Sequence, residues 1–576
     1  MKTGFQRTWI ILITLIIFSI TLISIIYAYT STTQFRSEAT FKYLTSSADQ
    51  TFSASSFAAT NKSPTINQFE GRLIISGAPT LVGNYGDMDD LLTGFEQWPT
   101  FNVDFVQSDN RLIPVDRHHG FIGNGPWSIT AGVGAVWDEA SDKGYTRAAF
   151  PYTIKENNAN CEHNGLATFL FKNDGTISNV HVQNIAETCV FYGFEFYGTL
   201  ASQYIPASIT NKSQIIDRRN REQAFWLPTK PLTELAIDYP GVNLANYGYA
   251  IKKETINGYS IAVNGISYIS GCNTRYGPHP YCTDKTIGTY SFAKSMHAFI
   301  AVAALEKQYP GFKNTLIKDL VAECNVDSRW QNVTVENALD MATGNYTSLE
   351  NQSDESSDAI VFGYFIPTTR AKRATFACTA WPKQTEPNRY HVYHTTDTEL
   401  VGYAVNQFLK TKQSKNSQGF NDIVIPIYEK IGLSEYIKGS QRTSDSQEAW
   451  AGYGLSMTVN DVVLFSQYLR DFALDDDLLD PTMVREVLTK QTRGLKVLNS
   501  DHHYDNGFWR FHADKKTKLA ACGSPTHLPV MSGFGGHTNI ILPDVIITQL
   551  TDGGRYEVSR TIDDVYDNIS QKCPAF

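Results

Sequence analysis

Ser291 and Lys294 form a Ser-x-x-Lys pair at the start of an apolar segment, and this spacing could support nucleophilic catalysis. Residues three apart lie on one face of a helix, so the lysine amine can reach the serine hydroxyl. A serine attacks a carbonyl only when a neighbouring base takes its proton, and a lysine in a dry pocket can be that base. Taken alone, so short a pattern is more often the start of a core helix with a surface lysine.

Four further motifs follow this pair in order: VTVENALDMATGN at 333–345, YHTTDTELVG at 393–402, GYGLSMTVNDVVLF at 452–465 and MSGFGGHTNIILPD at 531–544. Together with SFAKS, the series resembles the class C β-lactamase-like serine hydrolases. The closest resemblance is to the branch that contains the nylon-oligomer (aminohexanoate-oligomer) hydrolases and esterases. That branch carries Tyr-x-Ser-x-x-Thr-[Asp/Glu]-x-x-Gly, a pattern followed here by Tyr393, Thr395, Thr398, Glu399 and Gly402. The resemblance covers about residues 240–576.

The resemblance implies a catalytic group of Ser291, Lys294 and Tyr393. Ser291 would attack a carbonyl and become acylated. Lys294 and Tyr393 would relay protons, and the tyrosine would help to protonate the leaving group and to activate water. A tyrosine can do this when nearby positive charge lowers its pKa from about 10, and Lys294 is the expected source of that charge.

The resemblance also implies how the substrate is bound. The backbone N–H groups of Ser291 and Phe534 would bind the oxyanion. Gly533 and Gly536 suit a strand that a substrate backbone approaches closely. His537 is either a contact to the substrate or a structural histidine.

Three departures from the family pattern bear on the substrate. Met531-Ser532-Gly533 replaces Lys-Thr-Gly, so the cation that would hold a substrate carboxylate is missing. Thr395 stands where β-lactamases have Asn. Both changes favour an ester or a linear amide over penicillin. An acidic loop with Asp354, Glu355 and Asp358 is either solvated or holds a cationic substrate group.

The order of elements predicts a multidomain chain whose last part, 227–576, is an α+β, serine β-lactamase-like domain. Strands are expected in 249–270 and 538–554. Helices are expected after Ser291, ending at Pro310-Gly311, and within 334–342, 398–411 and 458–472. Strands, then helices, then strands indicate an antiparallel sheet with a helical lobe packed against it.

Residues 69–226 are expected to form a β-rich, all-β domain, a sandwich or a barrel, because short alternating runs are separated by turns. The clearest hairpin surrounds Asn173-Asp174-Gly175. Counting outward from this turn places Cys161 nearly opposite Cys189, which predicts a disulfide between them. The stretch from Trp226 to Glu234, with two prolines, is the expected boundary.

The N-terminal segment 1–29 indicates export. Lys2 and Arg7 precede an uncharged apolar run, Trp9 to Tyr29, that is long enough to span a bilayer. It is interpreted as a type II-like anchor or a cleaved signal peptide, and Ala28 would suit cleavage. Residues 30–68, rich in Ser and Thr, are interpreted as a stalk. Eight cysteines without a Cys-x-x-Cys pair fit an oxidising compartment.

Other classes of function receive less support. The net charge of −9 argues against a nucleic-acid partner. His118-His119 and His502-His503 lack metal-ligand spacing and are interpreted as solvated loop residues. There is no Gly-x-Ser-x-Gly motif.

The sequence therefore predicts an exported hydrolase of a small-molecule or peptide-like ester or amide, without metal or cofactor. Two alternatives remain open. One is a cell-surface binding protein on a degenerate hydrolase scaffold; the other is a β-lactamase or cell-wall D-peptidase.

Overall fold

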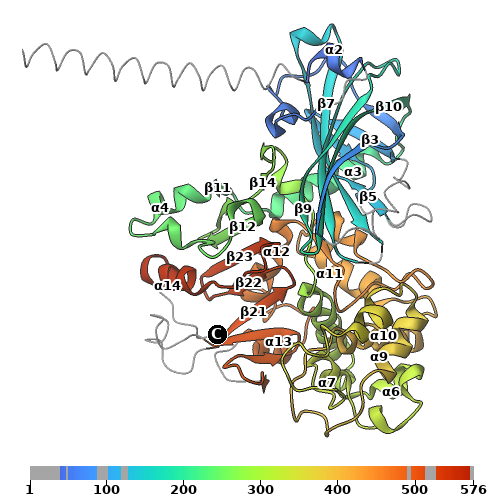
Figure 1. Ribbon diagram of the computed structural model, residues 1–576, viewed down its shortest axis with the longest axis vertical. Helices are drawn as coiled ribbons and strands as arrows, with labels where there is room; N and C mark the ends of the chain where they lie inside the picture. Colours follow the sequence, from blue (N-terminus) through green and yellow to red (C-terminus); the bar gives the residue numbers. More distant parts are fainter. Residues whose placement is uncertain are drawn as a thin grey trace, which may run out of the picture.

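The computed structural model describes residues 39–46, 50–86, 101–117, 127–157, 159–488, 494–512 and 527–570. A ten-stranded sheet lies at one end of the molecule, and a nine-stranded sheet with a lobe of helices lies at the other (Figure 1). The apolar run predicted from Trp9 to Tyr29 is outside the described residues. Within the described ranges, no helix combines the length and apolar character needed to cross a membrane.

The ten-stranded sheet closes on itself as an antiparallel barrel. Its strands follow the order β1-β3-β4-β6-β7-β8-β9-β10, and β10 pairs back with β1. Strand β5 adds to β7, and β2 adds to the first half of β10. The bounds are β1 Glu70–Ser76, β2 Thr80–Gly86, β3 Phe101–Ser108, β4 Arg111–Pro114, β5 Trp127–Ala131, β6 Gly134–Asp138, β7 Thr146–Glu156, β8 Glu162–Phe171, β9 Val180–Thr188 and β10 Tyr192–Pro206.

Closure leaves an apolar interior that side chains fill. Alternate residues such as Phe105, Phe150 and Phe169 point into it from neighbouring strands. Gly165 lies directly opposite Tyr152 on the neighbouring strand, and a Cβ at Gly165 would be 2.2 Å from the Tyr152 ring. The glycine thus leaves room for the tyrosine side chain on the adjacent strand.

The predicted hairpin and disulfide are confirmed. Strands β8 and β9 flank the turn at Asn173-Asp174-Gly175, and Cys161 is bonded to Cys189. Cys272–Cys282 and Cys324–Cys378 are also bonded, and three disulfides fit an extracellular or periplasmic location.

Two expectations for the N-terminal half are wrong. The described part of 30–68 is not a free stalk, because Leu44, Phe52 and Phe57 are buried against the barrel wall. The region 69–226 is also not all β, since it ends in helix α3, Lys212–Phe225. This helix is largely polar, and its buried Arg219 and Glu222 join ion pairs rather than an apolar core, so its sequence carries little helical periodicity.

The nine-stranded sheet starts immediately after this helix. Its order is β11-β13-β12-β23-β22-β21-β20-β19-β18, antiparallel except for the parallel pair β11–β13. The bounds are β11 Thr229–Pro231, β12 Ile256–Val263, β13 Ile266–Ser270, β18 Leu495–Lys496, β19 His503–Asp505, β20 Phe508–His512, β21 His527–Gly533, β22 His537–Ile541 and β23 Val545–Thr551.

Both faces of this sheet are covered. Ile547 packs on one face with side chains of α4 and α14, and its neighbour Ile546 packs on the other with side chains of α5 and α12. The predicted strands and helices of 249–554 are confirmed, and capping boxes at Thr334 and Thr458 start two of the helices. The helices are α2 Phe41–Leu44, α4 Leu235–Asp238, α5 Ile300–Gln308, α6 Ile317–Leu320, α7 Val335–Leu339, α8 Asp358–Ile360, α9 Arg370–Thr379, α10 Thr395–Lys412, α11 Ile425–Lys430, α12 Val459–Asp471, α13 Pro481–Leu488 and α14 Ser559–Asn568.

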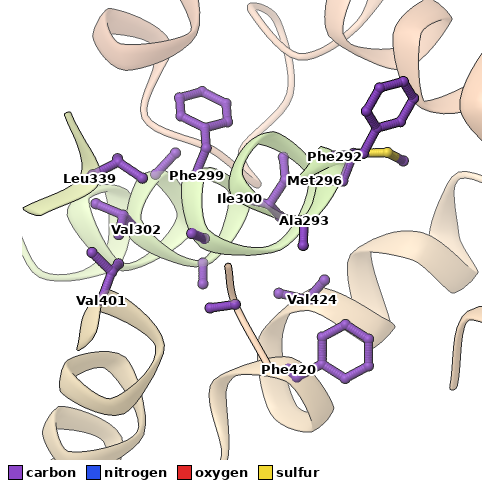
Figure 2. Close-up of a cluster of buried hydrophobic side chains, with 14 of the residues drawn as sticks. Phe292, Ala293, Met296, Phe299, Ile300, Val302, Leu339, Val401, Phe420 and Val424 are labelled. Carbon is purple, nitrogen blue, oxygen red and sulfur yellow. The ribbon is translucent and has the colours of Figure 1, made fainter. Parts of the chain in front are cut away.

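The helix that follows Ser291 is the centre of the largest core. It begins as a π-helix, η8 Lys294–Phe299, and continues as α5. Figure 2 shows its apolar side chains packed against Val401 of α10, Leu339 of α7 and Phe420 and Val424 of η13, Phe420–Val424. Because this helix is buried along its length, its first turn is held firmly in place.

Buried polar contacts fasten the barrel to the C-terminal half, which contains the nine-stranded sheet. Arg117 of the barrel binds Glu222 of α3, and Arg219 of α3 binds Asp284 beyond the boundary. Tyr436 joins both halves, since its hydroxyl donates to Asp284 and accepts from the backbone N–H of Val133. Separating a buried ion pair is costly, because each charge is left without its partner. These pairs therefore hold the two halves together.

Candidate active site

Ser291 lies at the junction of a short strand and the central helix. Strand β16, Ile287–Gly288, pairs with β17, Ser456–Met457, and leads into Tyr290, which has φ of 48°. A non-glycine residue in this left-handed region is strained by roughly 1–3 kcal/mol, so the surrounding structure must hold it. The next residue, Ser291, is only partly buried, whereas Phe292 and Ala293 are in the core. The hydroxyl is therefore presented at the surface by a rigid turn.

Lys294 is placed as a base for Ser291. Its Nζ donates to Ser291 Oγ at 3.1 Å, to Thr395 Oγ1 at 2.9 Å and to the carbonyl oxygen of Gly452 at 2.8 Å. Burial lowers the pKa of Lys294 to about 8, against the charges of Glu355, Glu399 and Asp397, which raise it. The predicted Ser-x-x-Lys contact is thus present, and the amine loses its proton at a lower pH than an ordinary lysine, with a pKa of about 8.

A partly buried carboxylate extends this chain of hydrogen bonds. The Thr395 hydroxyl donates to Glu355, and the Thr395 backbone N–H donates to the other Glu355 oxygen at 2.9 Å. Burial raises the pKa of Glu355. The sequence indicates an acidic loop here, but no pattern distinguishes Glu355 from Asp354 and Asp358. The contact of Glu355 with Thr395 depends on how the loop folds.

Tyr393 also reaches Ser291. The Ser291 side chain is near enough to lower the pKa of its phenol, and Lys294 Nζ lies 4.9 Å from the centre of its ring. The expected lowering of the Tyr393 pKa is wrong: burial, and then the Glu355 carboxylate, raise it above 10. Tyr393 is therefore a protonated phenol, suited to donate a proton, and Lys294 is the group suited to accept one.

The other residues of the Tyr393 motif support the site from behind. Glu399 accepts the backbone N–H groups of Ala451 and Gly452 and binds Arg373, so it holds the loop whose carbonyl contacts Lys294. His394 binds Asp354 at 2.9 Å and stacks on Trp381. The two flanking carboxylates, Asp354 and Asp397, outweigh burial and raise the pKa of His394 to about 9.

Strand β21 brings the predicted oxyanion segment beside the turn that leads to Ser291. A Cβ at Gly533 would lie 2.5 Å from the carbonyl oxygen of Thr289, so only glycine allows this approach. Phe534 starts the turn to β22, and its ring meets the Tyr290 ring at 5.7 Å. Gly536 has φ of 102° and also has no room for a side chain. Met531, at the family's lysine position, is fully buried in the core.

His537 is a structural histidine in this fold. Its Nδ1 accepts the backbone N–H of Thr551 at 3.0 Å, which leaves Nε2 to donate to the carbonyl oxygen of Gly288 at 3.0 Å. Burial lowers its pKa to about 4. Both ring nitrogens are thus occupied by backbone contacts, and the side chain is enclosed.

The remaining predicted polar residues lie in different settings. Asp358 is exposed at the start of α8. His503 is the first residue of β19 and is half-buried, so it is not a solvated loop residue. His118 and His119 are outside the described residues. Over the described ranges, no group of three His, Cys, Asp or Glu side chains is arranged to hold a metal ion.

The barrel contributes directly to the site, which the sequence did not predict. The side-chain oxygen of Asn160 accepts the backbone N–H of Tyr290 at 2.8 Å and that of Gly454 at 3.1 Å. The Tyr290 hydroxyl contacts the carbonyl oxygen of Thr188 at 3.4 Å and Cys161 Sγ at 3.6 Å. These contacts join residues about 100 to 300 positions apart, a separation at which single-sequence patterns carry no signal.

No family model and no curated protein sequence matches the chain. Among solved structures, it is similar to a protein from Bacillus anthracis assigned as a 6-aminohexanoate-dimer hydrolase, with 14% identity and a TM-score of 0.41 over 59% of this chain and 82% of that one. It is also similar to a class C β-lactamase, with 12% identity and a TM-score of 0.39 over 64% of this chain and 99% of that one. A D-stereospecific amidohydrolase from Streptomyces sp. matches with 13% identity and a TM-score of 0.38 over 62% of this chain and 99% of that one. These are the kinds of serine hydrolase that the motifs predicted. At such low similarity, the roles of individual residues depend on the geometry above.

Proposed function

We propose that this protein is an exported serine hydrolase that cleaves an ester or amide bond through an acyl-enzyme on Ser291. One observation carries the proposal: a buried lysine, with its pKa lowered to about 8, lies 3.1 Å from the hydroxyl of a partly exposed serine. A nucleophile within hydrogen-bond reach of a base, with that base oriented by further contacts, is the arrangement that activates serine.

Acylation would begin with a neutral Lys294. Its amine accepts the Ser291 proton as Oγ forms a bond to the carbonyl carbon. The backbone N–H groups of Ser291 and Phe534 bind the resulting oxyanion. Tyr393 donates its proton to the leaving group as the carbon–leaving-group bond breaks, and the Lys294 ammonium then returns a proton to Tyr393. Both groups end this half-reaction in their starting forms.

Deacylation would repeat these steps with water. Lys294 takes a proton from the water as its oxygen bonds to the acyl carbon. Tyr393 donates its proton to Ser291 Oγ as the bond between Oγ and the acyl carbon breaks, and the Lys294 ammonium then returns a proton to Tyr393. The hydrogen bonds from Lys294 to Thr395 and to Gly452 hold the amine near Ser291 throughout. Proton transfer by a positioned group typically contributes about 10²–10⁴-fold to the rate.

An ester or linear amide is favoured over a β-lactam. Met531 is buried in the core where the family's β-lactamases carry a lysine, so strand β21 offers no cation there for a substrate carboxylate. In this proposal, segment 1–29 anchors the chain in the membrane or is removed as a signal, and residues from 39 onward are exported.

The proposal is tested with the full chain, wild type and Ser291→Ala, on a chromogenic p-nitrophenyl ester. We expect turnover and an acyl adduct, seen by intact mass spectrometry, only in the wild type. Ser295→Ala is the matched control, because Ser295 lies four residues further along the same helix and its hydroxyl donates to the carbonyl oxygen of Gly507. Equal turnover in wild type and Ser291→Ala, with no adduct, would disprove the proposal and favour the binding-protein alternative.

A further inference from the structure

A cluster of exposed apolar side chains adjoins Ser291. Four residues form it: Val190 and Phe191 from the β9–β10 turn of the barrel, Phe534 from the β21–β22 turn, and Tyr556. Their exposed fractions are 37%, 59%, 44% and 43%. Large apolar side chains that stay exposed next to one another mark a binding surface more often than isolated ones do.

These residues meet where the two halves of the protein come together. The rings of Phe191 and Phe534 stack with centres 5.2 Å apart and planes 21° apart. A Cβ on Gly535 would lie 3.0 Å from a Val190 methyl group. A Cβ on Gly536 would lie 2.5 Å from the carbonyl oxygen of Arg555, the residue that directly precedes Tyr556. The cluster is thus one surface built from the barrel and the catalytic sheet.

The cluster starts one residue from the nucleophile. The Phe534 ring packs edge-on against Tyr290, which directly precedes Ser291. Phe534 also carries the N–H that would bind the oxyanion, so a bound carbonyl lies next to its ring. Since the leaving group must face Tyr393 to receive its proton, the acyl substituent is the part of the substrate left to face Phe534.

The barrel turn is held rigid before any substrate binds. Cys189 comes directly before Val190 and is bonded to Cys161. After the turn, the Tyr192 hydroxyl donates to the buried Glu156. A surface already ordered in its binding position loses little entropy on binding, which favours a role in recognition.

We infer that the β9–β10 turn of the barrel forms one wall of the acyl-binding site and that the enzyme takes substrates with an apolar acyl group. This inference rests on the proposed function. It assigns the barrel a part in substrate choice: Phe191 and Phe534 cover an aliphatic or aromatic acyl group while Ser291 attacks its carbonyl. Phe191 is a specificity residue in this role and takes no part in proton transfer.

The test compares p-nitrophenyl octanoate with p-nitrophenyl acetate on the full chain. We expect wild type to prefer octanoate and Phe191→Ser to lower the octanoate-to-acetate ratio of kcat/KM by about tenfold, the scale of losing apolar contact in a specificity pocket. Phe472→Ser is the control, because Phe472 is 56% exposed but lies at the end of α12, outside the cluster. An unchanged ratio in Phe191→Ser would overturn the inference.

A binding measurement separates this inference from the proposed hydrolysis. In the Ser291→Ala background, calorimetric titration should show that octanamide binds and that acetamide does not. Adding Phe191→Ser should weaken octanamide binding about tenfold. Octanamide binding without any Ser291-dependent turnover would keep the apolar site and reject the chemistry. Turnover with no difference between octanamide and acetamide would keep the chemistry and reject the site.

Discussion

Two regions of different chemistry border Ser291. On one, the buried Lys294 and Thr395 and the partly buried Glu355 are joined by short hydrogen bonds within the helical lobe. On the other, Phe191 and Phe534 form an apolar surface open to solvent. Proton transfer needs groups held at fixed distances away from water, whereas recognition of an apolar group needs uncovered surface. The chain places these two requirements in different parts of the fold.

Replacing Lys294 with methionine should have the largest effect and should act only on the polar region. Methionine keeps the length of the side chain but cannot accept a proton, so we expect kcat to fall about 10³-fold, or about 4 kcal/mol. Steady-state kinetics with p-nitrophenyl acetate measures this. Lys285→Met is the matched control. Lys285 is equally buried, and burial lowers its pKa to about 8 as well, but its amine binds Asn257 and not Ser291. Similar losses of kcat in both variants would contradict the assignment.

Removing the barrel disulfide should lower both the stability of the protein and its preference for octanoate, whereas removing a disulfide of the helical lobe should lower only the stability. Cys161→Ser with Cys189→Ser opens a loop of 28 residues, and we expect a loss of about 3.5 kcal/mol in the free energy of unfolding. Because this bond anchors the β9–β10 turn, the preference for octanoate should fall as well. The control is the lobe disulfide Cys324–Cys378, whose loss over 54 residues should cost about 4 kcal/mol and leave the preference intact. Urea unfolding and ester kinetics measure both quantities.

Asn160 tests whether the barrel positions the nucleophile. Alanine at this position removes the acceptor for two buried N–H groups, so we expect a loss of about 2 kcal/mol in stability and a fall in kcat of about tenfold for every ester. Asn164→Ala is the control, since Asn164 also crosses to the catalytic half, at Thr286, but does not touch Tyr290. If Asn164→Ala lowered kcat as much, the effect would be one of general stability.

The pH dependence should show the smallest effect. Lys294 acts as a base only when neutral, so kcat/KM should rise with pH through an apparent pKa of about 8 and then level off. The Glu355 charge raises the Lys294 pKa, and Glu355→Gln should therefore move this midpoint down by about one unit. Glu350→Gln, an exposed change in the same loop, should leave it in place. A midpoint unmoved by Glu355→Gln would show that this carboxyl is uncharged in the working range.

The polar region could largely be predicted from the sequence. Ser291 and Lys294 are one helical turn apart, and helix geometry brings them together in almost any fold that contains the helix. The capping boxes at Thr334 and Thr458 and the Cys161–Cys189 pair are likewise set by local spacing. The pKa of Tyr393 was predicted in the wrong direction, because burial and Glu355, neither visible locally, outweigh the nearby lysine.

The apolar region and the barrel contacts could not be predicted in this way. Phe191 and Phe534 are two among 32 phenylalanines, and nothing near either one indicates that they stack. Helix α3 was missed because ion pairs to the barrel and to Asp284, rather than an apolar stripe, bury its inner face. Such contacts depend on how the two halves are docked.

The sequence by itself determined the Ser291–Lys294 pair, the order of elements in the C-terminal half and one disulfide, because each depends on local spacings along a helix or a hairpin. Only the tertiary structure decided that Glu355 extends the hydrogen bonds of Lys294, that Asn160 holds the turn before Ser291, and that Phe191 stacks on Phe534 near Ser291. These contacts bring together side chains that lie from 40 to more than 300 residues apart. Closure of the barrel and its docking on the catalytic sheet fix those distances.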